Sequence, residues 1–111
     1  MDAERRRNPR ERITVTVRYA GTSPRSDYTD NVSRTGMFIL TTRSRAIGTR
    51  FRCLISFPRL LPPITVVAVV RWMRTDPSEE RGLGIEFEAV EPEARAQLDL
   101  FLDWVRAVPI D

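Results

Sequence analysis

The segment ITVTVRY, at residues 13–19, alternates strictly between apolar and polar side chains. Its odd-numbered residues are apolar and its even-numbered residues are polar, which is the period of a strand with one buried face. The β-branched residues that dominate the segment are also typical of strands. The segment therefore predicts a half-buried β-strand, the first of the chain.

Five further strands are expected at short intervals along the chain, separated by polar turns and a proline-rich loop. We place them at residues 26–30, 37–42, 50–57, 64–73 and 82–88. Short strands at regular spacing, with one apolar face each, are typical of a small antiparallel barrel. The sequence thus predicts a six-stranded antiparallel β-barrel.

The pattern changes from strand to helix spacing near the end of the chain. After Pro92, the apolar residues fall three or four positions apart or side by side, as on one face of a helix, at Ala94, Leu98, Phe101, Leu102 and Val105. Pro92 suits the first helical position, and Pro109 ends the helix. The fold class is therefore all-β with one C-terminal helix, with residues 13–111 forming the barrel and the helix spanning about 92–107. We expect this helix to cover a barrel opening or a sheet edge.

The composition excludes several classes of chemistry. The chain has 111 residues, no histidine and one cysteine, and all 18 of its basic residues are arginine. Without histidine, Ser-His and Cys-His nucleophile pairs are excluded. A single cysteine also excludes an internal disulfide and, without histidine, a zinc or iron–sulfur site. We therefore expect no catalytic residues, no metal site and no enzymatic activity.

No segment of the sequence suggests a membrane. The longest apolar run is far short of the ~20 residues of a membrane span. The first residues, MDAE, lack the apolar stretch of a secretory signal. We expect a cytoplasmic protein without membrane contact.

The positive charge is concentrated in the first half of the chain. Residues 1–52 hold twelve arginines and five acidic residues, a net charge of +7, whereas residues 53–111 hold six and ten, a net charge of −4. This asymmetry indicates an anionic partner for the first half. Residues 1–12 also have almost no apolar content, so we expect a flexible arm when no ligand is bound.

Two arginines in this arm, Arg6 and Arg10, form an Arg-x-x-x-Arg motif. Positions four apart in an extended chain point to the same side, with their Cα atoms roughly 13 Å apart. The planar guanidinium binds phosphate or the guanine edge through two hydrogen bonds, and it stacks on flat rings. The motif therefore indicates a clamp for an anion or a base, although a solvated basic tail is the alternative.

A second motif, Asn31-x-Ser33-x-x-Gly36, lies in the polar turn before the third strand. Asparagine offers a donor and an acceptor to a base edge, and serine offers a hydroxyl. Glycine permits a positive φ or the close approach of a ligand to the backbone. The alternative is an ordinary turn, in which the asparagine and serine side chains bond the local backbone.

The two motifs, in this order and on this strand pattern, resemble the PilZ domain family of bacterial receptors for the second messenger cyclic di-GMP. The segments at 48–49, 70–72 and 82–87 are also similar to PilZ segments, so the resemblance covers nearly the whole chain. It implies a six-stranded antiparallel β-barrel with a C-terminal helix. It also implies cyclic di-GMP as the ligand, with no cofactor.

The resemblance assigns roles to individual residues. Arg6 and Arg10 would contact the phosphates and guanine edges, Asn31 and Ser33 would meet a guanine, and Gly36 would let the backbone turn beneath the ligand. The position before Arg6 is associated in the family with an intercalated pair of ligands, and an arginine there is similar to the members that bind two. Arg5 therefore also counts among the ligand-binding residues, and the remaining candidates for ligand contact are Arg7 and Arg34.

These features favour a receptor or adaptor that signals when the ligand orders its arm and its contacts with an effector protein change. One alternative is a PilZ-type protein-interaction domain that binds no nucleotide. A second is a single-stranded nucleic-acid binder, which would need exposed aromatic residues along its strands. Most aromatic residues fall on inward faces, with Phe51 and Trp72 expected in the core, and the acidic second half would repel a polyanion. Nucleic acid is therefore not expected as a partner.

Overall fold

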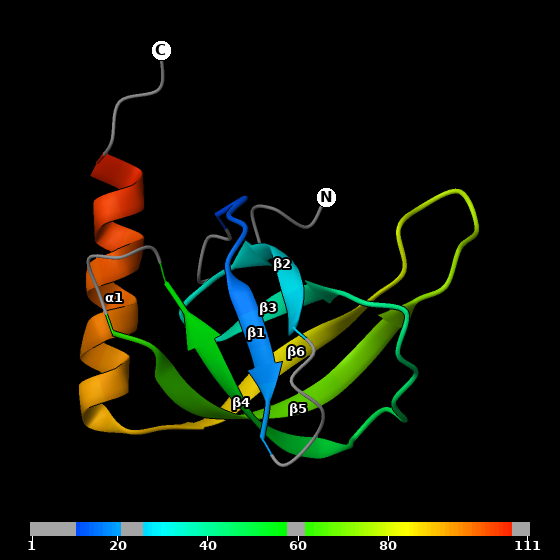
Figure 1. Cartoon of the computed structure of the whole chain (residues 1–111), viewed down its shortest axis with the longest axis horizontal. Helices are drawn as coiled ribbons and strands as arrows, with labels where there is room; N and C mark the ends of the chain where they lie inside the picture. Colours follow the sequence, from blue (N-terminus) through cyan, green and yellow to red (C-terminus); the bar gives the residue numbers. More distant parts are fainter. Residues whose placement is uncertain (1–10, 21–25, 58–61, 108–111) are drawn as a thin grey trace.

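The computed structural model describes residues 11–20, 26–57 and 62–107 (Figure 1). Six antiparallel strands form a closed barrel in the order β1-β2-β3-β6-β5-β4, and one helix follows them. The elements are β1 (Thr16–Tyr19), β2 (Ser26–Val32), β3 (Gly36–Leu40), β4 (Arg50–Ser56), β5 (Ile64–Arg74), β6 (Gly82–Val90) and α1 (Pro92–Ala107). The predicted fold class, a six-stranded antiparallel β-barrel with one C-terminal helix, is confirmed.

The first strand begins three residues later than its alternation predicts. The Thr29 hydroxyl donates a hydrogen bond to the Ile13 carbonyl at 2.7 Å and accepts one from the Val15 backbone amide at 3.0 Å. A buried side chain thus takes the place of part of the backbone ladder over residues 13–15. Periodicity alone does not reveal this exchange, because Val15 still packs into the core.

The second strand is longer than predicted and includes Asn31 and Val32. The register of β2 against β3 shifts between Thr29 and Asn31, so Asp30 forms a bulge. After the bulge, Asn31 pairs with Phe38. The predicted turn over residues 31–36 is therefore shortened to the three residues between β2 and β3.

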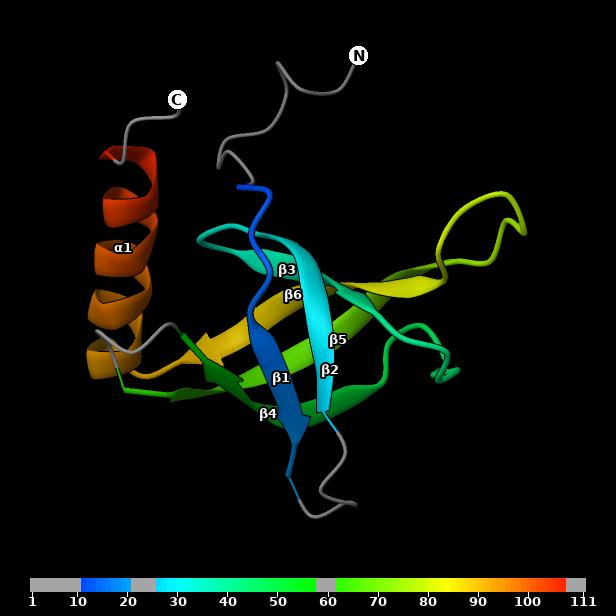
Figure 2. The ribbon, with the colours of Figure 1, turned by 45° about the horizontal axis from the view of Figure 1, so that its top comes forward.

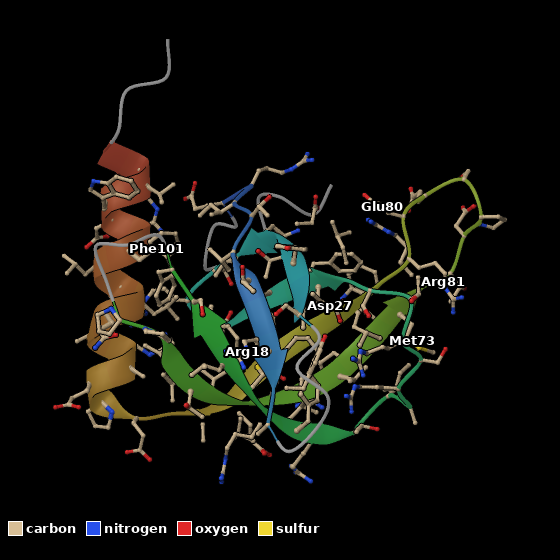
Figure 3. The ribbon with its side chains drawn as sticks, viewed as in Figure 1. Arg18, Asp27, Met73, Glu80, Arg81 and Phe101 are labelled. Atoms are coloured by element: carbon tan, nitrogen blue, oxygen red, sulfur yellow. The ribbon has the colours of Figure 1, made fainter. Side chains whose placement is uncertain are left out.

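Helix α1 closes one end of the barrel and is held there by its apolar face. Leu98, Phe101 and Leu102 are at most 2% exposed, and the Phe101 ring lies 4.6 Å from the ring of Phe57. Figure 3 shows the Phe101 side chain pointing from the helix toward the barrel. Each such side chain stabilises the docked helix by roughly 1.5–3 kcal/mol. The helix in the described residues is not long and apolar enough to cross a membrane.

The hairpin of β5 and β6 extends beyond the barrel at the end away from α1 (Figure 2). On the inside of the barrel, Cys53 is fully buried, and burial raises the pKa of its thiol to about 12. A thiol held in its protonated form is a poor nucleophile, so Cys53 is a core residue.

Candidate functional site

The strand register aligns four residues in one row across the outer surface of the barrel. Asn31 of β2 pairs with Phe38 of β3, Phe38 pairs with Gly84 of β6, and Gly84 pairs with Trp72 of β5. The neighbours of Phe38 along β3 are both core residues, which places Phe38 and its row partners on the outer surface. We call these four residues the outer row.

The outer row carries an aromatic surface beside Asn31. The rings of Phe38 and Trp72 lie 5.0 Å apart, and the Arg74 guanidinium lies 4.3 Å from the centre of the Phe38 ring. Phe38 is only 2% exposed because these neighbours cover it, whereas Trp72 is 47% exposed. About half of the indole therefore remains exposed to solvent beside Asn31.

The sequence-based expectation that Trp72 lies in the core is wrong. Even-numbered residues of β5 face inward as far as Val70, but the register against β6 shifts between Val70 and Trp72. This irregularity reverses the side on which Trp72 emerges. Phe51, by contrast, is partly buried and packs against the core as expected.

A signal for this arrangement exists in the sequence, in the two glycines of β6. A Cβ atom on Gly84 would lie 2.0 Å from the Trp72 Nε1 atom, and one on Gly82 would lie 2.4 Å from the Phe38 ring. The two glycines leave the space that the aromatic rings occupy. A Gly-x-Gly pattern in one strand, with aromatic residues in its neighbours, indicates such an external cluster.

The turn of the second motif is built around Ser33. The Ser33 hydroxyl is 3.3 Å from the Gly36 carbonyl, to which it donates, and it accepts a hydrogen bond from the Thr35 amide at 3.3 Å. Ser33 is 1% exposed. These contacts are the ones expected of an ordinary turn, in which the serine side chain bonds the local backbone. They fix the backbone that positions Asn31 on one side of Ser33 and Arg34 on the other.

Gly36 is required by the packing of two strands. A Cβ atom at this position would lie 2.1 Å from the Ile85 carbonyl oxygen in β6. Its φ lies outside the left-handed region, because Gly48 is the residue with a positive φ among those described. Gly36 therefore permits a close approach between β3 and β6 rather than an unusual turn.

The chain that follows the first motif is joined to the second motif by a backbone pair. The Glu11 amide donates to the Val32 carbonyl at 2.9 Å, and the Val32 amide donates to the Glu11 carbonyl at 3.0 Å. Val32 is the residue between Asn31 and Ser33. Beside this pair, Arg12 lies 3.6 Å from the Asp30 carboxylate. The arm therefore joins the barrel at the second motif.

Four of the five arginines of the arm lie outside the described residues. These are Arg5, Arg6, Arg7 and Arg10. The expected flexibility of residues 1–12 also falls almost entirely outside the described part of the chain.

Helix α1 borders the second motif on its other side. The Arg34 guanidinium donates two hydrogen bonds to the Asp99 carboxylate, at 2.7 and 3.2 Å, and Arg95 donates one to the Arg34 carbonyl. Near the end of the helix, Arg106 binds Glu11 at 2.9 Å. The Asp99 side chain is 35% exposed while holding Arg34.

A hollow of about 200 Å³ lies between the motif turn and the helix. It is lined by Arg34, Asp99, Leu102, Asp103 and Arg106. The hydrogen bond from Arg34, the largest influence on the carboxyl, holds the pKa of Asp99 below its usual value. No cluster of three metal-ligating side chains occurs within the described ranges. The hollow is a surface of paired charges, lined by two arginines and two aspartates.

Comparison with known families matches the arm, the barrel and most of the helix together. The family model described as PilZ domain matches residues 4–104. The chain belongs to the PilZ domain family. The resemblance in the two motifs is thereby confirmed at the level of the family. Comparison with curated protein sequences gave no match.

Solved structures similar to this PilZ domain share its fold. The Bacillus subtilis inhibitor of motility MotI/DgrA is 22% identical, with a TM-score of 0.77, over 94% of this chain and 53% of that chain. YcgR from Escherichia coli in complex with cyclic di-GMP is 19% identical, with a TM-score of 0.74, over 92% and 46%. The PilZ domain of YcgR with cyclic di-GMP is 19% identical, with a TM-score of 0.69, over 92% of both chains. The chain spans about half the length of the first two proteins.

Proposed function

We propose that this PilZ domain is a bacterial, cytoplasmic receptor for cyclic di-GMP. The pairing of Glu11 with Val32 carries the proposal, because it joins the chain directly after Arg10 to the segment that contains Asn31 and Ser33. The proposal accordingly makes the two motifs, twenty residues apart in sequence, parts of one surface. The YcgR structures that share the fold contain this ligand.

In this proposal the arm supplies the charge and the barrel supplies the surface for the bases. Arg6 and Arg10 bind phosphates or guanine edges, since guanidinium groups suit both. Asn31 meets the polar edge of one guanine. Trp72 stacks against another, because its indole is half exposed and lies in the same outer row.

The outer row suits a ligand with two bases. Asn31 and Trp72 lie at its two ends, and Phe38 and Gly84 lie between them. A dinucleotide, or two intercalated copies of one, presents separate guanines to two such positions. Arg5, beside Arg6, adds charge for the additional phosphates of a second copy.

The proposed output is a change in protein contacts without any chemical reaction. The arm closes over the ligand and an effector protein then recognises the closed form. The arm has almost no apolar residues before Ile13, so the order of a closed arm depends on the ligand. A PilZ domain that binds only protein, without nucleotide, is the competing function.

Titration calorimetry with cyclic di-GMP tests the proposal, with cyclic di-AMP and GTP as control ligands. The double variant Arg6→Ala/Arg10→Ala is expected to lose binding. Arg18→Ala is the matched control, because Arg18 is exposed on β1 and pairs with Ser26 at the far end of β2 from Asn31 (labelled in Figure 3). Retained binding in the double variant, or no binding by the wild-type protein, would reject the proposal.

A further inference from the structure

Arg34 lies inside the second motif, yet its charge is held by the C-terminal helix. Its guanidinium makes a two-pronged contact with Asp99, although the two residues are 65 positions apart in sequence. The two side chains are 48% and 35% exposed, so the pair is in contact with solvent. The backbone of Arg34 is also fixed, because its carbonyl accepts the hydrogen bond from Arg95.

The hollow beside this pair is close to electrically neutral. Its two cations are Arg34 and Arg106, and its two anions are Asp99 and Asp103. Arg106 is engaged by Glu11 at 2.9 Å and by Asp103 at 3.5 Å. An anion that approaches the motif turn therefore meets arginines that already have carboxylate partners.

The strengths of the contacts decide which of them can change. The helix is anchored by Leu98, Phe101 and Leu102, which are almost fully buried. Burial of three such side chains contributes far more free energy than one exposed ion pair. The Arg34–Asp99 pair can therefore open while the helix stays in place.

We propose that Asp99 competes with cyclic di-GMP for Arg34. In the free protein Asp99 holds the guanidinium, and in the complex Arg34 turns to a ligand phosphate while the Asp99 carboxylate is released. Carboxylate and phosphate accept the same paired hydrogen bonds from arginine, so the two partners are exchangeable. Asp99 thereby sets the affinity of the receptor without touching the ligand. This inference rests on the proposed function.

The position of Arg34 supports a phosphate contact. Arg34 directly follows Ser33 and lies beside the point at which the arm joins the barrel, where Glu11 pairs with Val32. In the proposed complex, a ligand that meets Asn31 has its phosphates at this corner. The apparent affinity for such a ligand equals the intrinsic affinity multiplied by the fraction of molecules in which Arg34 is not held by Asp99.

Calorimetric titration of Asp99→Asn with cyclic di-GMP, compared with Asp103→Asn, tests the competition. Both substitutions remove one negative charge from the same side of the helix, but Asp103 contacts Arg106 rather than Arg34. We expect Asp99→Asn to bind about two- to fivefold more tightly than the wild type. Asp103→Asn is expected to increase the affinity for cyclic di-GMP clearly less. In an Arg34→Ala background, the effect of Asp99→Asn should disappear.

The outcomes separate this inference from the proposed function. If the wild type binds cyclic di-GMP and Asp99→Asn increases the affinity no more than Asp103→Asn does, the proposed competition is wrong while the receptor function stands. If the wild type does not bind cyclic di-GMP, the receptor function itself fails. The NMR signal of the Arg34 Nε–H group gives a second measurement in the wild-type protein. It should shift when the ligand is added, and an unchanged signal at saturation would also contradict the competition.

Discussion

Substitution of Gly84 by alanine should expel Trp72 from its place over β6. The new Cβ atom would lie 2.0 Å from the indole Nε1 atom and 2.3 Å from Cε2. The nearest atoms belong to a side chain that can rotate, so the backbone pairing of β5 and β6 is expected to survive. The cost of the substitution is therefore the loss of the contacts of Trp72.

That cost follows from the burial of the indole. Trp72 is 47% exposed, so roughly half of the ~200 Å² of a tryptophan side chain is covered. At about 25 cal/mol per Å² this burial contributes about 2.5 kcal/mol, and the aromatic pair with Phe38 adds about 1 kcal/mol. Because the displaced ring keeps some contacts, we expect a destabilisation of about 2–3 kcal/mol. For a domain of this size, this lowers the melting temperature by roughly 10 °C.

Thermal and denaturant unfolding of a double-mutant cycle with Trp72→Ala measures the effect. In that background the space above Gly84 is empty. Gly84→Ala should then stabilise the domain by about 0.5–1 kcal/mol, since alanine restricts the unfolded chain more than glycine does. The sign of the effect thus depends on Trp72. An equal loss of stability with and without the indole would refute this reasoning.

Four further predictions concern other parts of the molecule. Gly36→Ala should lower the free energy of unfolding by more than Gly84→Ala does, upward of about 3 kcal/mol, because its Cβ would meet a backbone oxygen at 2.1 Å. Urea unfolding measures both losses, and a smaller loss for Gly36→Ala than for Gly84→Ala would contradict the prediction. Asp99 has a lowered pKa in the folded protein, so its contribution to stability should be present near neutral pH and lost as the pH falls through that pKa. The difference in melting temperature between the wild type and Asp99→Asn should therefore shrink from about pH 7 to pH 3, and a constant difference would contradict the prediction. The Cys53 thiol, with a pKa of about 12, should react with a thiol reagent only in denaturant, and fast labelling of the folded protein would disagree. Calorimetry should give two cyclic di-GMP molecules per chain, as Arg5 suggests, and a stoichiometry of one at high protein concentration would exclude the intercalated pair.

The sequence was sufficient for the barrel and insufficient for the direction of particular side chains. Alternation along residues 13–19 and 82–88 predicts strands because it reflects burial on one face. A bulge shifts the alternation by one position, and the periodicity within β2 or β5 marks neither Asp30 nor the irregularity before Trp72. The sequence pattern therefore predicts Trp72 in the core, although it lies on the outer surface.

The two motifs were recognisable, but their connections to the helix were not. Asn31, Ser33 and Gly36 stand close together in the sequence, and local turn chemistry explains their spacing. The contact of Arg34 with Asp99 depends on how the helix packs across the barrel end, which no local pattern specifies. Exposed ion pairs between distant residues add too little free energy to leave a signature in composition.

The closed barrel also limits how another protein can attach to this domain. Within the closed part of the barrel, each of the six described strands has a hydrogen-bonded neighbour on both sides. A partner therefore cannot extend this part of the sheet by adding a strand of its own, which is a common way to bind a peptide with little dependence on its sequence. Recognition there must instead rely on side chains. Leu100 and Trp104 are exposed along one side of α1. An effector that binds in this way would distinguish this domain from others that share its backbone.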